Sequence, residues 1–476
     1  MDKIISRFEG GWQQPESAQA GHFAVYDPAT QEVIARVEET VLDSLAKVVV
    51  NAQTGLAALR QKTATQRAQI LRTWYELIVE NRDVLAELVT RESGKPLSES
   101  LAEVDYAAGF VIWYGEEAKR AYGQIIPATA INQKVSTIKQ PVGVVFGITP
   151  WNFPLAMITR KVAPAYAAGC SFILKPSETT PLSAIALHHL ALEAGFEVQD
   201  WQLVHTQEPK ALASYFCGSA AVQKITFTGS TQVGRSLMEQ GASTIKRLSL
   251  ELGGNAPFIV FASADVDAAV EGLIAAKYRN AGQTCIAANR VFVESACYEE
   301  FLTKLTAKVA TLKQGNGLQS GIALGPLINA KAKERVTSVV NEALIAGATL
   351  HYQAKDLGGN FYPATILTEV KAEMAVANQE LFGPIIAIQQ FTTEDEVIAF
   401  ANNVPEGLAS YFYSSHAGQI ERVGNALQCG MVGINTGAIS NPAAPFGGMK
   451  QSGLGREGAQ IGLDEYLEVK YLCQTF

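Results

Sequence analysis

A cysteine in an unusual setting is the first residue that could do chemistry. Cys285 lies in the polar, glycine-bearing segment YRNAGQTCIAANR (278–290), with Arg279 six positions upstream. Free cysteine is usually a small buried hydrophobe, whereas a reactive cysteine needs a nearby cation, a helix N-terminus or a base to form its thiolate. The six histidines lie in contexts that give a Cys/His pair little support, so another base is required.

Glu251 is the candidate base. It stands between an apolar strand pattern and a diglycine in LSLELGGNAPF (248–258), where few charges belong. Burial at such a place would raise the pKa of the carboxyl toward that of a useful general base. The alternative is a structural carboxylate that caps a helix or pairs with a lysine, and the local sequence leaves both open.

Asn152 is the candidate donor to an oxyanion. It belongs to TPWNFPLAM (149–157), a proline-rich turn that follows a buried strand pattern. Ligands of open α/β folds bind at the carboxyl ends of the strands, where an amide N–H could face a developing negative charge. A rigid turn with only a structural role is an equal alternative.

Two further segments suggest contacts to a nucleotide. FTGSTQVG (227–234) has the form of a strand, turn and helix, but Gly229 and Gly234 do not complete the GxGxxG fingerprint. KPSE (175–178) follows a strand pattern, so Lys175 and Glu178 would project at the same sheet edge and could bond sugar hydroxyls. A solvated loop is the alternative for KPSE.

The elements around these residues predict an α/β fold. A helical period runs from about 39 to 120, and strand and helix patterns then alternate, which favours mostly parallel sheets covered on both faces. Expected strands are 136–150, 171–178, 200–206, 221–230, 289–295 and 382–391; expected helices are 155–168, 180–195, 265–282, 298–313 and 330–347. The C-terminal DEYLEVKYLCQTF alternates like an exposed strand that could pair with 133–141, within the fold or across a subunit boundary.

Composition narrows the function class. The 476 residues are 48% hydrophobic and 18% charged with a net charge of −8, typical of a globular protein of two or three domains. Nucleic acid and anionic membranes are not expected partners. The six scattered cysteines lack metal-ligand spacing, so no metal site is expected. MDKIISRFEGGW has no apolar core of signal-peptide length, which predicts a cytoplasmic protein.

Taken together, these segments resemble the aldehyde dehydrogenase superfamily from about residue 20 onward. The motifs TPWNFP, KPSE, FTGSTQVG, ELGGNAP, GQTC, ELFGP and PFGGMKQSGLGREG occur in the family's order. The resemblance implies that Cys285 attacks the aldehyde carbon, that the Asn152 amide and the Cys285 backbone N–H stabilise the oxyanion, and that Glu251 activates the water that hydrolyses the thioester.

The resemblance also implies a variant Rossmann domain that binds NAD, with NADP possible. The pyrophosphate would lie near Gly229 and Ser230. A carboxylate at Glu178 would repel a 2′-phosphate and so favours NAD. The cofactor-binding residues implied are Thr149, Pro150, Trp151, Lys175, Ser177, Glu178, Gly229, Ser230, Glu380 and Phe382.

Within the superfamily, MITRK (157–161), YRNAGQTC and the C-terminal motifs are most similar to succinate-semialdehyde dehydrogenases. That similarity implies that Arg160, Arg279 and Ser440 bind the distal carboxylate of the substrate, since arginine presents a fork that matches a carboxylate. The alternative for the arginines is an interdomain salt bridge. Glutarate semialdehyde is one methylene longer, and the sequence does not rank the two substrates.

The resemblance predicts three structural units. Residues 1–119 and 142–253 would form the dinucleotide-binding domain, 254–452 the catalytic domain, and 120–141 with 453–476 a bridging segment of a homodimer or homotetramer. Two rival functions remain. An acyl-CoA-forming relative usually lacks the carboxylate at the position of Glu251, and a non-enzymatic descendant of the fold would have no use for Cys285, Glu251 and Asn152 together.

Overall fold

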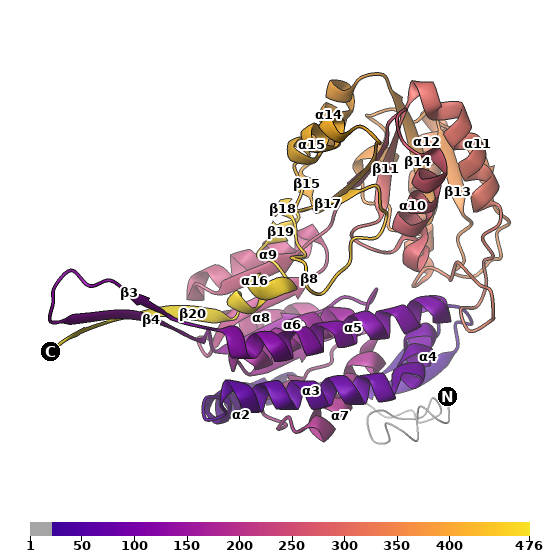
Figure 1. The fold of residues 1–476 in the computed structure, drawn as a ribbon. Helices are drawn as coiled ribbons and strands as arrows, with labels where there is room; N and C mark the ends of the chain where they lie inside the picture. Colours follow the sequence, from indigo (N-terminus) through magenta and orange to yellow (C-terminus); the bar gives the residue numbers. More distant parts are fainter. Residues whose placement is uncertain (1–20) are drawn as a thin grey trace.

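The computed structural model describes residues 21–476, arranged as two α/β lobes and a projecting arm (Figure 1). The first lobe is built on a six-stranded sheet, mostly parallel. Its strands, in spatial order, are β19 (Gly453–Leu454), β9 (Arg247–Glu251), β8 (Val222–Thr228), β5 (Val144–Ile148), β6 (Phe172–Lys175) and β7 (Trp201–Leu203). A separate hairpin joins β1 (His22–Tyr26) to β2 (Val33–Glu38).

Helices cover both faces of this sheet because its strands are apolar on both sides. One face carries α2 (Leu45–Leu59), α8 (Pro209–Gly218) and α9 (Thr231–Gly241). The other carries α3 (Ala64–Glu80), α4 (Arg82–Ser93), α5 (Leu97–Glu117), α6 (Ala156–Ala168) and α7 (Pro181–Ala194). The helical pattern at 39–120 corresponds to the four helices α2 to α5. The elements from β5 to β9 alternate between strand and helix, which confirms the expected βαβ alternation.

The second lobe has a seven-stranded sheet in which only β12 is antiparallel. The spatial order is β12 (Thr349–Gln353), β13 (Thr365–Thr368), β14 (Ile385–Phe391), β11 (Ala288–Glu294), β10 (Ala256–Val260), β16 (Ala409–Tyr413) and β17 (Met431–Ile434). On one face lie α10 (Val266–Tyr278) and α11 (Tyr298–Val309); on the other lie α12 (Ala330–Ile345), α13 (Ala375–Asn378), α14 (Glu394–Asn402) and α15 (Ala417–Ala426).

Two expected helices end earlier than their sequence patterns suggest. The first, α10, stops at Tyr278, because Asn280 and Ala281 take left-handed backbone conformations in the 3-10 turn Arg279–Gly282. The second, α11, stops at Val309 instead of 313. The remaining short elements are β15 (Glu406–Gly407), β18 (Met449–Lys450), α16 (Ala459–Asp464) and the 3-10 turns Leu42–Ser44, Ala118–Arg120, Ala242–Thr244 and Ser295–Cys297.

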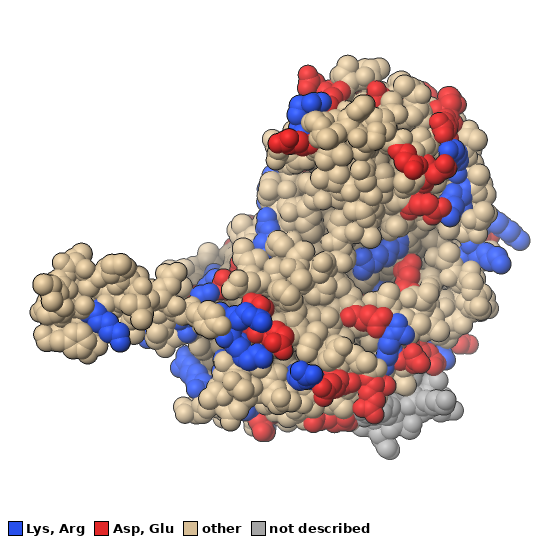
Figure 2. Space-filling model, viewed as in Figure 1, with Lys and Arg blue, Asp and Glu red and all other residues tan. Residues whose placement is uncertain are grey.

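The arm is a three-stranded antiparallel sheet in the order β20 (Leu467–Thr475), β4 (Gln133–Pro141) and β3 (Gln124–Ile126). The predicted pairing of 133–141 with the C-terminal strand thus occurs within one chain, with Leu467 opposite Pro141. Residues 453–466, expected as part of the arm, instead place β19 in the first sheet and α16 against α5 and α6. In Figure 2 the arm shows few charged side chains on the visible face.

No helix among residues 21–476 is long and apolar enough to cross a membrane. The expectation drawn from MDKIISRFEGGW falls on residues 1–12, which lie outside the described range, as does the beginning of the first predicted domain.

Candidate active site

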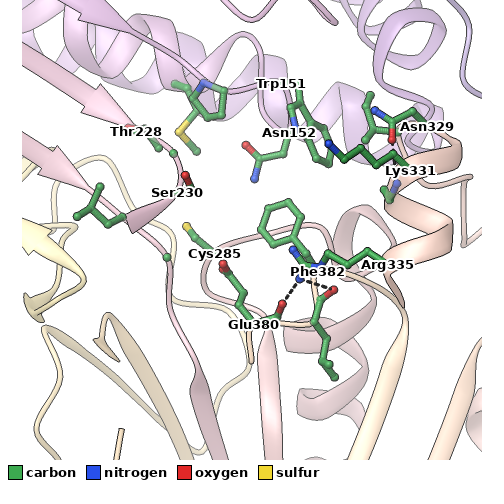
Figure 3. A pocket seen from close by; sticks show the side chains of 18 of the residues that line it. Trp151, Asn152, Thr228, Ser230, Cys285, Asn329, Lys331, Arg335, Glu380 and Phe382 are labelled. Atoms are coloured by element: carbon green, nitrogen blue, oxygen red, sulfur yellow. Dashed lines mark hydrogen bonds between the residues drawn. The ribbon is translucent and has the colours of Figure 1, made fainter. Parts of the chain in front are cut away.

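A cavity of 460 Å³ lies between the two lobes at the carboxyl ends of β5, β8 and β9. It collects segments that are far apart in the chain: the turn after β5, the turn after β8, the end of β9, the loop that holds Cys285, the start of α12 and the ELFGP loop. Of the predicted site residues it is lined by Pro150, Trp151, Asn152, Gly229, Ser230, Glu251, Cys285, Glu380 and Phe382. Figure 3 shows Asn152, Cys285 and Phe382 pointing into the same space.

The backbone before Cys285 is folded by an unusual left-handed run. Asn280, Ala281 and Gly282 have φ angles of 51°, 53° and 77°, and each non-glycine residue in this region costs about 1 kcal/mol or more. The Gln283 side chain stabilises the run, since its Nε2 donates to the Asn280 carbonyl at 3.0 Å and its Oε1 accepts from the Ile328 N–H at 2.9 Å. The strain therefore serves to turn the chain from α10 toward the cavity.

The diglycine after Glu251 allows three segments to meet. A Cβ on Gly253 would lie 2.9 Å from Glu380 Oε2, and a Cβ on Gly254 would lie 2.5 Å from the Cys285 carbonyl oxygen. At Gly254 no other residue type fits, because the clash is with backbone, whereas at Gly253 the end of the Glu380 side chain would have to move aside. ELGG thus brings the base candidate, the nucleophile candidate and the ELFGP loop together, which the sequence pattern alone did not explain.

Burial favours the neutral thiol form of Cys285 over the thiolate. Desolvation raises its pKa to about 12, against the opposing attraction of Arg160 and Arg279. The structure therefore has the expected cations near the thiol, but the effect of burial on the thiol pKa is larger than the effect of the two arginines. A base must therefore remove the proton as the sulfur attacks.

Glu251 has the environment of a buried base. Burial raises the pKa of this carboxyl, and the negative charge of Glu457 raises it further, while Arg160 and Lys161 oppose the shift. Its Oε2 is buried without a hydrogen-bond partner among residues 21–476, so it can accept a proton from a water or a thiol. A raised pKa is the property expected of a general base near neutral pH, and the helix-cap alternative is not what the structure shows.

Asn152 is held with its amide group in a defined orientation. Its Nδ2 donates to the Gln283 carbonyl oxygen at 3.0 Å, which identifies that atom as nitrogen because a carbonyl can only accept. The second N–H of the same amide remains to serve an oxyanion. Gln283 stands two residues before Cys285, so one hydrogen bond links the donor to the nucleophile loop.

The turn after β8 has the features of a phosphate site. Ser230 is the N-cap of α9, with its hydroxyl accepting from the Val233 N–H, and a helix N-terminus favours an anion. A Cβ on Gly229 would meet the Phe227 ring at 2.4 Å, and one on Gly234 would meet Leu252 at 2.5 Å. These glycines allow the turn to pack closely against Phe227 and Leu252, although the GxGxxG fingerprint is incomplete.

The other end of the cavity carries the ELFGP loop. The rings of Phe382 and Trp151 meet edge to face with centroids 5.6 Å apart. Burial raises the pKa of Glu380 to about 7. Arg335 of α12 donates to the Glu380 and Leu381 carbonyl oxygens (Figure 3) and so fixes this loop.

The KPSE residues lie beside the cavity and are not in its lining. Lys175 ends β6, next to the turn after β5, where the Thr149 N–H donates to the Lys175 carbonyl at 3.2 Å. The Lys175 Nζ lies 2.6 Å from Glu178 Oε2. Ser177, which precedes Glu178 in the chain, is buried. Lys175 and Glu178 therefore project together, as expected, from the strand next to the main site.

None of the three predicted carboxylate ligands lines the cavity, but Arg160 and Arg279 are close enough to the Cys285 thiol to act on its charge. Arg279 donates from Nη1 to Ser440 Oγ at 3.0 Å and stacks over the Phe153 ring. Arg160 is buried at 1% exposure, stacks over Phe446 and forms an ion pair with Glu457 through Nε. Its Nη1 and Nη2 have no hydrogen-bond partner among residues 21–476.

Several residues of the site were not found from the sequence. Lys331 and Arg335 line the cavity from α12, and Glu457 with Lys161 lies behind Glu251. Glu457 is within a quoted motif, GREG, but nothing in its neighbours indicates burial. Lys161 follows Arg160 directly on a helix that is otherwise apolar, and two adjacent cations there were a usable signal.

Comparisons with known proteins agree with this geometry. Residues 12–472 match the model of the aldehyde dehydrogenase family. The chain is 49% identical over 464 residues to a glutarate-semialdehyde dehydrogenase of Pseudomonas putida, covering 98% of this chain and 96% of that one. It is 47% identical over 466 residues to an NADP(+)-linked succinate-semialdehyde dehydrogenase of Escherichia coli, with the same coverage.

A solved structure extends the likeness to three dimensions. The crystal structure of succinate-semialdehyde dehydrogenase from Burkholderia pseudomallei superposes with a TM-score of 0.95 at 48% identity, covering 99% of both chains. The order of motifs, the thiol and carboxylate at one interdomain cavity and these matches lead to one conclusion. The chain belongs to the aldehyde dehydrogenase family and is an NAD(P)-dependent enzyme that oxidises aldehydes.

Proposed function

We propose that the enzyme oxidises an aldehyde with a distal carboxylate, most simply succinate semialdehyde, to the dicarboxylic acid. The observation that carries this proposal is the state of Arg160, whose two Nη atoms are buried without a partner in the described chain. Arg160 contacts the carboxylate of Glu457 through Nε, so the outer edge of its guanidinium is left without an acceptor. Buried donors need acceptors, and a substrate carboxylate bound in a fork would supply them.

The chain's own residues support a covalent mechanism. The Cys285 sulfur bonds to the aldehyde carbon as Glu251 takes the thiol proton, and the Asn152 amide and the Cys285 backbone N–H face the resulting oxyanion. Ser230 and Glu380 would hold NAD(P)+, which would supply the acceptor for the hydride. Loss of hydride leaves a thioester on the sulfur. Glu251 first releases the thiol proton to solvent. It then takes a proton from water as the water oxygen bonds to the acyl carbon, and it returns that proton to the Cys285 sulfur as the carbon–sulfur bond breaks and the acid leaves.

The same geometry accommodates glutarate semialdehyde as the second candidate. A relative that is 49% identical carries that name, while a relative that is 47% identical is named for succinate semialdehyde. One methylene discriminates by only about 1–3 kcal/mol. Measured kcat/KM values for the two semialdehydes and for an uncharged aldehyde of equal length test the proposal. A preference for either semialdehyde supports it, and equal values for the uncharged aldehyde would contradict it.

Replacing the arginines should remove the preference for a charged substrate. In Arg160→Met and Arg279→Met, kcat/KM for succinate semialdehyde should fall by about 10²-fold, as expected for losing a buried charge-assisted pair. The value for the uncharged aldehyde should change little. Steady-state kinetics on both substrates measure the ratio.

Lys161→Met is the matched control for Arg160→Met. It also removes a cation from Glu457, but its ammonium pairs with Glu457 and Thr226. It should therefore affect charged and uncharged aldehydes by the same factor. If Lys161→Met lowered the ratio of kcat/KM for charged to uncharged aldehydes as much as Arg160→Met does, the preference would come from the overall positive charge of the buried groups and not from a carboxylate site at Arg160.

We infer that NAD is preferred to NADP. The support is Glu178, whose carboxylate lies 2.6 Å from the Lys175 ammonium at the edge where the adenosine ribose would lie. Like charge opposes a 2′-phosphate there. Glu178→Gln should lower the NAD/NADP ratio of kcat/KM by about tenfold, the effect of roughly 1.4 kcal/mol. An unchanged ratio in this variant would show that Glu178 does not read the ribose.

We also propose that the arm joins subunits into a homodimer or homotetramer. Its apolar side chains are exposed in the single chain, including Ile125 at 83% and Val469 at 66%. Exposed apolar surface of this kind marks an interaction site. Sedimentation of the purified protein at several concentrations tests this proposal, and a monomer at all of them would contradict it.

A further inference from the structure

A buried ion pair lies directly beneath the turn that carries Asn152. Lys95 follows the end of α4, and Glu103 lies on the apolar face of α5. Both side chains are fully buried, and they form an ion pair with each other. Removing two charges from water costs several kcal/mol unless further hydrogen bonds compensate, so the remaining contacts of this pair show what it holds.

Those contacts all go to one turn. The Lys95 ammonium donates to the Asn152 carbonyl oxygen at 2.6 Å and lies 4.0 Å from the centroid of the Phe153 ring. Glu103 Oε1 accepts from the Leu155 N–H at 2.8 Å, at the start of α6, and from Ala156 at 3.4 Å. The pair thus binds the backbone on both sides of Phe153, immediately after the oxyanion donor.

The turn depends on such outside contacts. Pro150 and Pro154 have no backbone N–H, so the chain between β5 and α6 has few donors with which to stabilise itself. A second donor reaches the Asn152 carbonyl from the other lobe, where Asn280 Nδ2 lies 3.0 Å away. The backbone N–H of Asn280 in turn donates to Glu99 of α5 at 2.6 Å. One carbonyl is therefore fixed from both sides of the cavity.

The turn that carries Asn152 must be held accurately in place. An oxyanion donor stabilises charge only when it is already at the right place, within about 0.5 Å of its productive geometry. The backbone of Asn152 has no sheet or helix bond at its carbonyl, because it stands between β5 and α6. Its bonds to Lys95 and Asn280 replace the regular secondary structure.

We propose that Lys95 and Glu103 are positioning residues for Asn152, and that they act on the rate of aldehyde oxidation through it. The inference rests on the oxyanion role proposed above for Asn152. Neither Lys95 nor Glu103 is itself among the residues that line the cavity. If the pair had only a structural role, replacing one of its residues would lower the stability of the protein and leave kcat unchanged. We expect the replacement to lower kcat as well, and this loss of rate should depend on the presence of the Asn152 amide.

A double-mutant cycle separates these roles, because residues that act through one another give non-additive effects. Asn152→Ala alone should lower kcat by about 10²–10³-fold, the usual effect of losing one oxyanion donor. Lys95→Met should lower kcat by about 10–10²-fold with KM for the aldehyde little changed. In the Asn152→Ala background, Lys95→Met should lower kcat by less than about threefold. Lys95→Arg, which keeps the charge and donors, should recover part of the rate.

Unfolding and a second buried pair provide the controls. Lys95→Met should lower the midpoint temperature of thermal unfolding. The decrease should be equal in the wild-type and Asn152→Ala backgrounds. Lys224 is also fully buried, and it pairs with Ser249 and Glu465 at the root of the arm. Lys224→Met should change kcat by the same factor in both backgrounds. Glu103→Gln, which keeps the shape of the side chain, provides the same cycle if Lys95→Met does not fold.

The outcomes distinguish the oxyanion role of Asn152 from the positioning role of Lys95 and Glu103. If Asn152→Ala changes kcat by less than twofold, the proposed oxyanion role is wrong. If Asn152→Ala is strongly impaired but Lys95→Met and Glu103→Gln cost the same factor in both backgrounds, the positioning role is wrong and the oxyanion role stands. Non-additivity confined to kcat, with additive changes in stability, is the result that the structure predicts.

Discussion

Cys285→Ala is expected to abolish aldehyde oxidation, with kcat falling by at least about 10⁴-fold, as when the nucleophile of a covalent mechanism is removed. The physical reason is that no other thiol among residues 21–476 lines the interdomain cavity. The variant should still fold and bind NAD, because the Gln283 contacts that shape the loop do not involve the sulfur. NADH formation and the quenching of nucleotide fluorescence measure the two properties separately.

Cys473→Ala is the control for this substitution. Cys473 is an exposed free thiol on β20 of the arm, far in sequence from every cavity residue. Its replacement should leave kcat within about twofold, the usual range for a surface change. A Cys285→Ala enzyme that retained a tenth of the wild-type rate would exclude covalent catalysis by this residue.

Glu251→Gln is expected to slow steady-state turnover by about 10²–10⁴-fold, the usual contribution of a general base. Hydride transfer precedes hydrolysis in the proposed sequence, so each subunit should still form up to one NADH before the acyl group blocks the sulfur. The first turnover should be slower than in the wild type, because the pKa of Cys285 is about 12 and the amide cannot accept its proton. Raising the pH should restore it by forming the thiolate directly.

The pH dependence of the wild type follows from the same carboxyl. Burial and Glu457 raise the pKa of Glu251, and only the deprotonated form acts as a base. The rate of thioester hydrolysis should therefore rise with pH through that raised pKa, and Glu251→Gln should lose this rise. Stopped-flow measurement of NADH formation checks both statements. A normal steady-state rate in Glu251→Gln would show that another group activates the water.

Much of the site was predictable because catalytic groups occupy places where the local sequence is unusual. Cys285 stands in a polar segment, Glu251 before a diglycine and Asn152 between two prolines, and the resemblance in motif order connected them. The alternation of strand and helix patterns predicted β5, β6, β7 and β8 of the first sheet and β11 and β14 of the second, since buried parallel strands and amphipathic helices differ in period. The C-terminal strand was found for the same reason. The alternation did not predict β12, β13, β16 and β17.

The remaining features depend on tertiary contacts. The end of α10 at Tyr278 is set by left-handed residues that no propensity favours, and that the Gln283 side chain holds in place. The pKa of the thiol depends on burial, which the polar neighbours of Cys285 in the sequence did not suggest. Glu103 was detectable in principle, because it lies at helical spacing with the buried residues Ser100, Val104 and Ala107.

The central claim is that the reaction passes through an acyl group on Cys285. Mass spectrometry of peptides from Glu251→Gln, quenched with acid after one turnover with NAD and succinate semialdehyde, tests this claim most directly. The peptide that contains Cys285 should gain the mass of a succinyl group, and the gain should disappear with hydroxylamine, which cleaves thioesters. If NADH forms in the first turnover while this peptide remains unmodified, oxidation does not proceed through the cysteine and the account is wrong.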